Sequence, residues 1–102
     1  MKHVVILGVA LGIACAVSTQ AAAQAQGPSP ATIARNCYLC HGPEGKTAGP
    51  MPRLAGQPAG AIAKALTDFK TDQRKGTIMN RIAKGYSDAD LQAVAQYLGN
   101  LK

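Results

Sequence analysis

The sequence has few of the side chains that usually fill a hydrophobic core. Its 102 residues contain no tryptophan, one phenylalanine, three tyrosines and three cysteines. This length allows one small domain and excludes a multidomain enzyme. Acidic residues are also scarce, with 5 Asp+Glu against 11 Lys+Arg, and the formal net charge is +6. Because the basic residues come with no nucleic-acid-binding motif and no interleaved aromatic residues, we expect no nucleic-acid partner.

Long hydrophobic runs are absent except at residues 4–17, where a basic leader precedes the run and an alanine-rich stretch follows it. This order is typical of a signal peptide. As a helix the run would rise only about 21 Å, against about 30 Å for a hydrocarbon core, so we expect no membrane anchor in the mature protein. Small residues permit cleavage after Ala23 or Ala25, and we favour Ala25. Residues 1–25 are therefore predicted to be a cleaved signal peptide that directs the chain to the periplasm.

The two cysteines that remain in residues 26–102 are three positions apart and are followed by a histidine. Cys37, Cys40 and His41 form the pattern CxxCH, which is typical of c-type haem attachment. A domain this small commonly needs a disulfide, a metal or a large prosthetic group for stability. Residues three apart project from one face of a helix, so both thiols can reach one edge of a haem while His41 serves as the proximal iron ligand.

Three other interpretations of the motif lack support elsewhere in the chain. A thioredoxin-like redox pair is expected within a βαβ frame, and the sequence has almost no β-branched alternation. A structural zinc site takes four ligands, whereas residues 26–102 offer two cysteines and one histidine. A simple disulfide would leave His41 unexplained. We therefore predict a monohaem domain at 26–102 with one covalent haem c, anchored through thioethers by Cys37 and Cys40.

Helix start and stop residues predict an all-α fold of three to four short helices. Ser29 is an N-cap before a proline, and Gly42 ends the helix that carries the CxxCH motif. A second helix is expected to start at Pro58, and Ser87 caps a last helix with acidic residues in its first turn. Residues 70–86 are expected to form a loop with at most one helical turn, at residues 81–84.

The distal iron ligand is expected to be a methionine. Residues 26–102 contain no second histidine, which excludes bis-histidine ligation and leaves Met51, Met79, a lysine, a tyrosine or the N-terminus. Met51 follows His41 by ten residues, where the chain is still near the proximal side. Met79 follows a whole intervening helix that lets the chain reach the other face of the haem. We therefore predict Met79 as the distal ligand and Met51 as a flexible side chain of the core.

Taken together, these features resemble a small class I cytochrome c. The resemblance rests on CxxCH, Gly49-Pro50 with Pro52, Leu54-Ala55-Gly56-Gln57, Met79, and Tyr97-Leu98 in the last helix. It implies that the first and last helices cross, that Tyr97 packs near Ile33, and that the carbonyl of Pro50 accepts the Nδ1–H of His41. Arg53 is a candidate contact for a haem propionate. The expected apolar walls of the haem pocket are Ile33, Leu54, Ile62, Leu66, Phe69, Ile78, Tyr86, Leu98 and Met51.

A narrower resemblance involves the segments 54–58, 69–70 and 79–88. They are similar to the cytochrome subunits of flavocytochrome c sulfide dehydrogenases and to related cytochromes of sulfur oxidation. This resemblance implies a periplasmic one-electron carrier that accepts electrons from a flavoprotein sulfide dehydrogenase subunit and passes them to a downstream cytochrome or oxidase. The protein itself would then be no enzyme. The alternatives are a general shuttle to a terminal oxidase and a haem sensor or enzyme with a labile sixth ligand.

Basic residues flank the predicted haem site and suggest electrostatic steering of an acidic partner. The competing interpretation is a surface that merely keeps the protein soluble. The residues proposed for steering are Lys46, Lys70, Arg74, Lys75, Arg81 and Lys84.

Overall fold

The computed structural model describes residues 27–102, so the predicted signal peptide at 1–25 lies outside the described residues and stays a prediction. The described part is helical and contains no strand. Its α-helices are α1 (Pro30–His41), α2 (Ala59–Lys70), α3 (Met79–Lys84) and α4 (Asp88–Gly99), with a short 3-10 helix at Pro43–Gly45. The prediction of an all-α fold is confirmed. No helix within 27–102 combines the length and hydrophobicity needed to cross a bilayer.

Serine caps start the first and last helices, as the sequence predicts. The Oγ of Ser29 accepts a hydrogen bond from the Thr32 backbone N–H at 3.2 Å. The Oγ of Ser87 accepts one from the Asp90 N–H at 3.1 Å. Each cap satisfies a backbone donor that has no partner within the helix.

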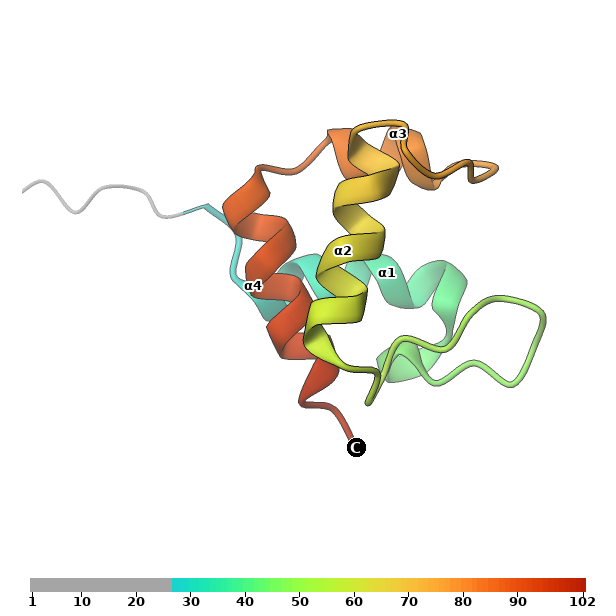
Figure 1. Cartoon of the computed structure of the whole chain (residues 1–102). Helices are drawn as coiled ribbons and strands as arrows, with labels where there is room; N and C mark the ends of the chain where they lie inside the picture. Colours follow the sequence, from blue (N-terminus) through green and yellow to red (C-terminus); the bar gives the residue numbers. More distant parts are fainter. Residues whose placement is uncertain (1–26) are drawn as a thin grey trace, which may run out of the picture.

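A small core lies where α2 and α1 pack against α4. In Figure 1, α2 and α4 lie side by side and α1 crosses behind them. Ala34 of α1 and Ala95 of α4 are fully buried in this core. Because an alanine side chain is small, the two helices can approach each other closely there. Ile33 belongs to the same cluster and Tyr97 packs against it, in agreement with the predicted crossing. The core thus holds α1, and with it the CxxCH motif, in a fixed position.

The third helix begins earlier than the sequence predicts. We expected a turn only at residues 81–84, whereas α3 starts at Met79. Ile78 stands at its N-cap position and cannot cap the helix with an apolar side chain. The helix is stabilised instead by packing against α2, which no local pattern encodes.

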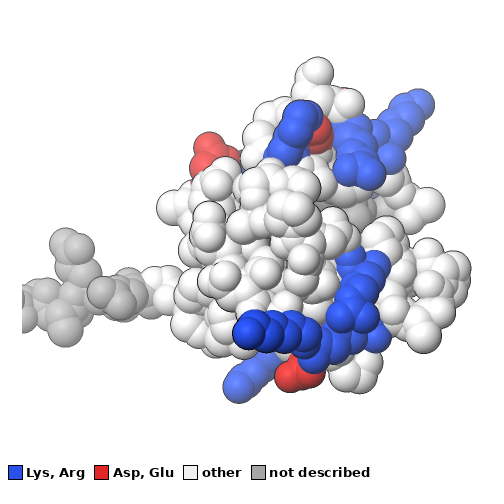
Figure 2. Space-filling view, turned by 60° about the horizontal axis from the view of Figure 1, so that its bottom comes forward, with Lys and Arg blue, Asp and Glu red and all other residues white. Residues whose placement is uncertain are grey.

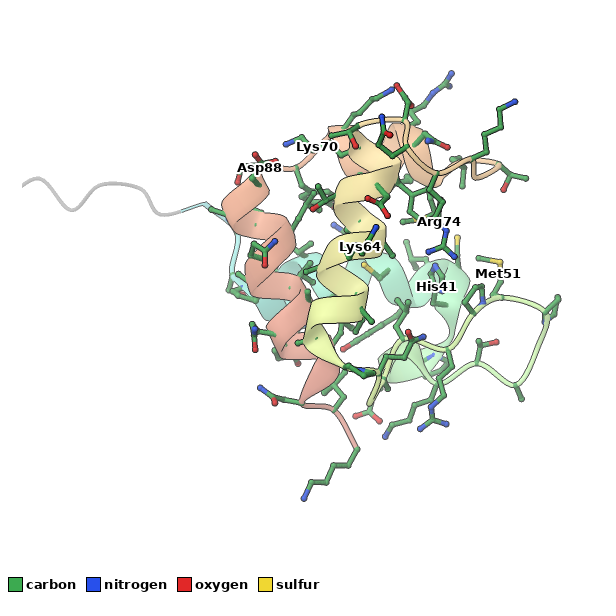
Figure 3. All side chains as sticks on the ribbon, in the orientation of Figure 1. His41, Met51, Lys64, Lys70, Arg74 and Asp88 are labelled. Carbon is green, nitrogen blue, oxygen red and sulfur yellow. The ribbon has the colours of Figure 1, made fainter. Side chains whose placement is uncertain are left out.

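Lys70 ties the end of α2 to the start of α4. Its Nζ donates to the backbone oxygen of Tyr86 and to Oδ1 of Asp88, both at 2.8 Å (Figure 3). The segment between α3 and α4 is thereby fixed against the helix pair.

Candidate functional site

A cavity of about 640 Å³ lies beside the core, a size typical of sites for small molecules and cofactors. Its walls come from all four α-helices and from the loop between α1 and α2. Every residue that the sequence predicts as an apolar wall lines it. These residues are Ile33, Leu54, Ile62, Leu66, Phe69, Ile78, Tyr86, Leu98 and Met51.

The CxxCH motif occupies the last turns of α1, and all three of its functional side chains line the cavity. Cys37 is half-buried, Cys40 is exposed, and both are free thiols. Burial raises the pKa of the Cys37 thiol above its usual 9.0, and the nearby Cys40 adds to the effect. Cys37 is therefore a protonated thiol at neutral pH, which does not suit the activated thiolate of a redox-active CxxC pair.

His41 is buried and oriented by a backbone carbonyl. Its Nδ1 lies 2.7 Å from the carbonyl oxygen of Pro52. A carbonyl can only accept, so Nδ1 donates its proton to this bond, which favours the tautomer whose lone pair is on Nε2. Because His41 also lines the cavity, its other ring nitrogen, Nε2, is the atom that could bind a metal there.

The acceptor of this bond corrects one expectation, because the resemblance assigned it to Pro50. Pro50 lies in the exposed bend at residues 49–51. The chain then returns towards α1, where the carbonyl of Gly45 accepts hydrogen bonds from the N–H groups of Leu54 at 2.9 Å and Ala55 at 3.2 Å. These bonds bring Pro52, rather than Pro50, against the end of α1.

Both candidate methionines line the cavity, but they come from different parts of the fold. Met51 is 37% exposed and lies in the loop whose next residue is bonded to His41. Met79 is half-buried and begins α3, which packs on α2. In Figure 3, Met51 lies beside His41 on the side of that loop. The sulfur atom of Met51 is therefore carried by the loop after α1, and that of Met79 by the first turn of α3.

The arginine nearest the cavity is not the one named from the sequence. Arg53 is absent from the cavity lining, and its Nε donates to the Ala55 carbonyl at 3.2 Å. Arg74 lines the cavity, and its guanidinium lies 5.1 Å from the centroid of the Phe69 ring. Figure 3 shows it on the same side of the molecule as His41. The sequence marked Arg74 only as one of several basic residues, because its contact with Phe69 depends on the turn after α2.

Ion pairs reduce the number of basic residues available for steering. Lys46, Lys70 and Lys84 pair with Glu44, Asp88 and Asp72. The other residues proposed for steering form no ion pair within 27–102; they are Arg74, Lys75 and Arg81. In Figure 2, basic side chains outnumber acidic ones on the visible face. The visible face is therefore mainly positive, but three of the six basic residues proposed for steering have their charge partly neutralised by an ion pair.

The arrangement of donors fits a haem better than a bare metal ion. Among the described residues no group of three or more His, Cys, Asp or Glu side chains could hold a metal by itself. The cavity instead combines an imidazole oriented by a backbone carbonyl, two thiols one helical turn apart and a wide apolar lining. Such a lining suits a large, flat, mostly apolar ring that brings its own metal.

Comparison with known proteins agrees with this chemistry. The family model for cytochrome c matches residues 28–102. The chain belongs to the cytochrome c family. This family binds one covalently attached haem c, and Cys37 and Cys40 are placed as in its CXXCH motif. Residues 28–102 therefore form a haem c domain of the electron-transferring cytochrome c type.

Individual relatives of this cytochrome c are similar to it over part of their sequence. Cytochrome c-552 of Acidithiobacillus ferridurans is 49% identical over 65 residues, which cover 64% of this chain and 28% of that protein. The cytochrome subunit of sulfide dehydrogenase of Chlorobaculum tepidum is 38% identical over 69 residues, which cover 68% of this chain and 63% of that protein. A solved cytochrome c4 from Acidithiobacillus ferrooxidans has a TM-score of 0.61 at 49% identity, covering 64% of this chain and 38% of that one. The class I fold predicted from the sequence is thereby confirmed, and the chain spans less than two thirds of each of these relatives.

Proposed function

We propose that this cytochrome c is a periplasmic one-electron carrier of sulfur oxidation, with a haem held by Cys37, Cys40, His41 and Met79. The observation that carries the proposal is the single apolar cavity that all four side chains line. Haem c supplies an Fe(III)/Fe(II) couple when bound, and a thioether ligand raises its reduction potential. The chain's own contribution is to fix the ligands and to surround them with apolar walls.

The two ends of the site perform separate tasks. On the α1 side, Cys37 and Cys40 would form the thioether anchors, and the Pro52 carbonyl fixes the imidazole of His41. On the α3 side, Met79 would fill the remaining iron position. Met79 is preferred over Met51 because it comes from a helix packed on α2, whereas Met51 belongs to the loop that already supports His41. With both positions filled, electron transfer is favoured over reactions of bound oxygen.

Substitution of each methionine tests the ligand set. We expect Met79→Ala to remove the absorption band of methionine-ligated ferric haem and to let carbon monoxide bind the ferrous protein readily. Met51→Ala is the matched control, because it removes the other cavity methionine and should leave the band in place. Loss of the band in Met51→Ala, with no change in Met79→Ala, would reverse the assignment.

Sulfur oxidation is the proposed setting for two reasons. Residues 79–88 resemble the cytochrome subunits of flavocytochrome c sulfide dehydrogenases, and a relative at 38% identity is named as such a subunit. The proposed donor is therefore a flavoprotein sulfide dehydrogenase subunit, and the acceptor a downstream cytochrome or oxidase. The similarity to cytochrome c-552 and to a cytochrome c4 favours the alternative of a general shuttle to a terminal oxidase.

The partner can be tested with the native protein. The cytochrome would be purified from its source in low salt, and fractions would be examined for a co-eluting flavoprotein and for reduction by sulfide. Sulfide-dependent reduction in the flavoprotein fraction, but not of the isolated cytochrome, would support the sulfur pathway. A flavin-free cytochrome that is inert to sulfide yet is oxidised by a terminal oxidase would support the general shuttle. Recovery in the periplasmic fraction, with an N-terminus after Ala23 or Ala25, tests export.

A further inference from the structure

The side chain of Asn80 makes several of the hydrogen bonds that hold the loop between α2 and α3. Its Oδ1 accepts a hydrogen bond from the Gly76 N–H at 2.8 Å. Its Nδ2 donates to the Arg74 carbonyl at 2.7 Å and to the Phe69 carbonyl at 3.1 Å. A longer contact of 3.3 Å joins Nδ2 to Oδ1 of Asp72. A single amide thus connects the end of α2, the loop and the first turn of α3.

The surroundings of Asn80 determine the orientation of its amide. The atom on one side is a backbone N–H donor, and the atoms on the other side are oxygen acceptors. An exchanged amide would place its oxygen against those oxygens and its NH₂ against the Gly76 N–H. Asn80 is half-buried, so the cost of leaving these groups without partners is only partly relieved by water.

Gly76, which Asn80 holds, lies in close contact with Met79. A Cβ added to Gly76 would lie 2.9 Å from Cε1 of Phe69 and 3.3 Å from Cβ of Met79. The Gly76 backbone therefore fills the space between the Phe69 ring and Met79. Asn80 is therefore linked to Met79 in two ways, as its neighbour in the chain and through its hydrogen bond to Gly76.

We propose that Asn80 is a positioning residue that keeps the Met79 side chain directed at the cavity; the role rests on Met79 being the distal ligand. Asn80 does not line the cavity. It acts by holding the loop and the first turn of α3 in one arrangement. Without its bonds, Gly76 is free to move away from Met79, and the sulfur competes less well for the iron.

Imidazole titration of the ferric holoprotein tests this proposal, because imidazole competes with Met79 for one coordination position. We expect Asn80→Ala to bind imidazole about tenfold more tightly than the wild-type protein, the change in affinity that corresponds to about one net hydrogen bond. Asn80→Asp keeps an acceptor for the Gly76 N–H but loses the donors, so it should also bind imidazole more tightly. If Asn80→Ala fails to retain haem, the imidazole affinity of Asn80→Asp tests the proposal instead.

Two controls separate positioning from general destabilisation. Gln73→Ala removes another amide side chain from the same loop. The Nε2 of Gln73 makes only a long contact of 3.5 Å with the Thr71 carbonyl. Ser29→Ala removes the α1 cap and lowers stability at a site outside the cavity. Both should bind imidazole as the wild-type protein does.

Each outcome has a defined meaning. Unchanged imidazole affinity in both Asn80 variants, or an equal increase in either control, would overturn the positioning role while leaving Met79 as the ligand. If Met79→Ala itself leaves the ferric spectrum unchanged, the ligand assignment fails, and the role of Asn80 fails with it.

Discussion

Gly42, the residue after His41, should be intolerant of any side chain. Its φ of 84° and ψ of 165° lie in a region that is essentially restricted to glycine. A Cβ there would lie 2.9 Å from both the N and Cα atoms of Thr47. These are backbone atoms, and the Thr47 N–H is bonded to the His41 carbonyl at 3.1 Å, so the clash cannot be relieved by rotating a side chain.

The expected cost of Gly42→Ala follows from these two effects. Strain in such a region costs about 1–3 kcal/mol, and displacement of the Thr47 backbone adds to it, giving about 2–4 kcal/mol in total. For a domain of this size that corresponds to a Tm lower by roughly 10–30 °C. Thermal unfolding of the holoprotein, followed by circular dichroism, measures the change.

Gly60→Ala is the matched control for this substitution. Gly60 lies in α2, and a Cβ there would meet nothing within 4 Å. The exchange should therefore stabilise the protein by about 0.5 kcal/mol through helix propensity. If Gly42→Ala unfolded at the same temperature as Gly60→Ala, the reasoning from backbone strain would be refuted.

Three further predictions concern a cap, a pH dependence and a salt dependence. Ser87→Ala should cost about 1 kcal/mol in urea unfolding, because the Asp90 N–H loses its partner; no change would contradict the capping role. The hydrogen bond from Lys84 lowers the pKa of Asp72 below its usual 3.8, so the stability it adds is present above 3.8 and lost as pH falls through the lower folded-state pKa. Asp72→Asn should thus lower stability at neutral pH and have no effect in strong acid, and a difference independent of pH would exclude this linkage. Affinity for an acidic redox partner should fall as ionic strength rises, and a constant affinity would remove the steering hypothesis.

Local chemistry was sufficient to predict where the first and last helices begin. Ser29 and Ser87 each cap a helix through a bond that spans three residues, so the sequence contains both partners close together. The cavity walls within helices were equally predictable, because apolar residues at helical spacing face a common interior. These parts of the fold depend on short-range patterns.

The remaining details depend on contacts between distant segments. The choice of Pro52 over Pro50 is made by the bonds from Leu54 and Ala55 to Gly45, which close a loop that has no periodic pattern. The start of α3 at Met79 depends on packing against α2 and on the bonds of Asn80. An asparagine in a polar loop has many ordinary explanations, so no local pattern distinguishes Asn80 from other polar loop residues.

The scarcity of large apolar side chains and the presence of a large cavity have one explanation. Within residues 27–102, half of the buried apolar residues are alanines, so the helices pack closely and contribute few large side chains to the core. The exposed large apolar residues of the same part of the chain, Leu39, Met51, Ile78 and Ile82, all line the cavity. Apolar walls of this kind are stable only when something apolar covers them. A covalent haem would cover these walls, so it would complete the hydrophobic core as well as supply the redox group, in a chain that has one phenylalanine and no tryptophan to fill that space itself.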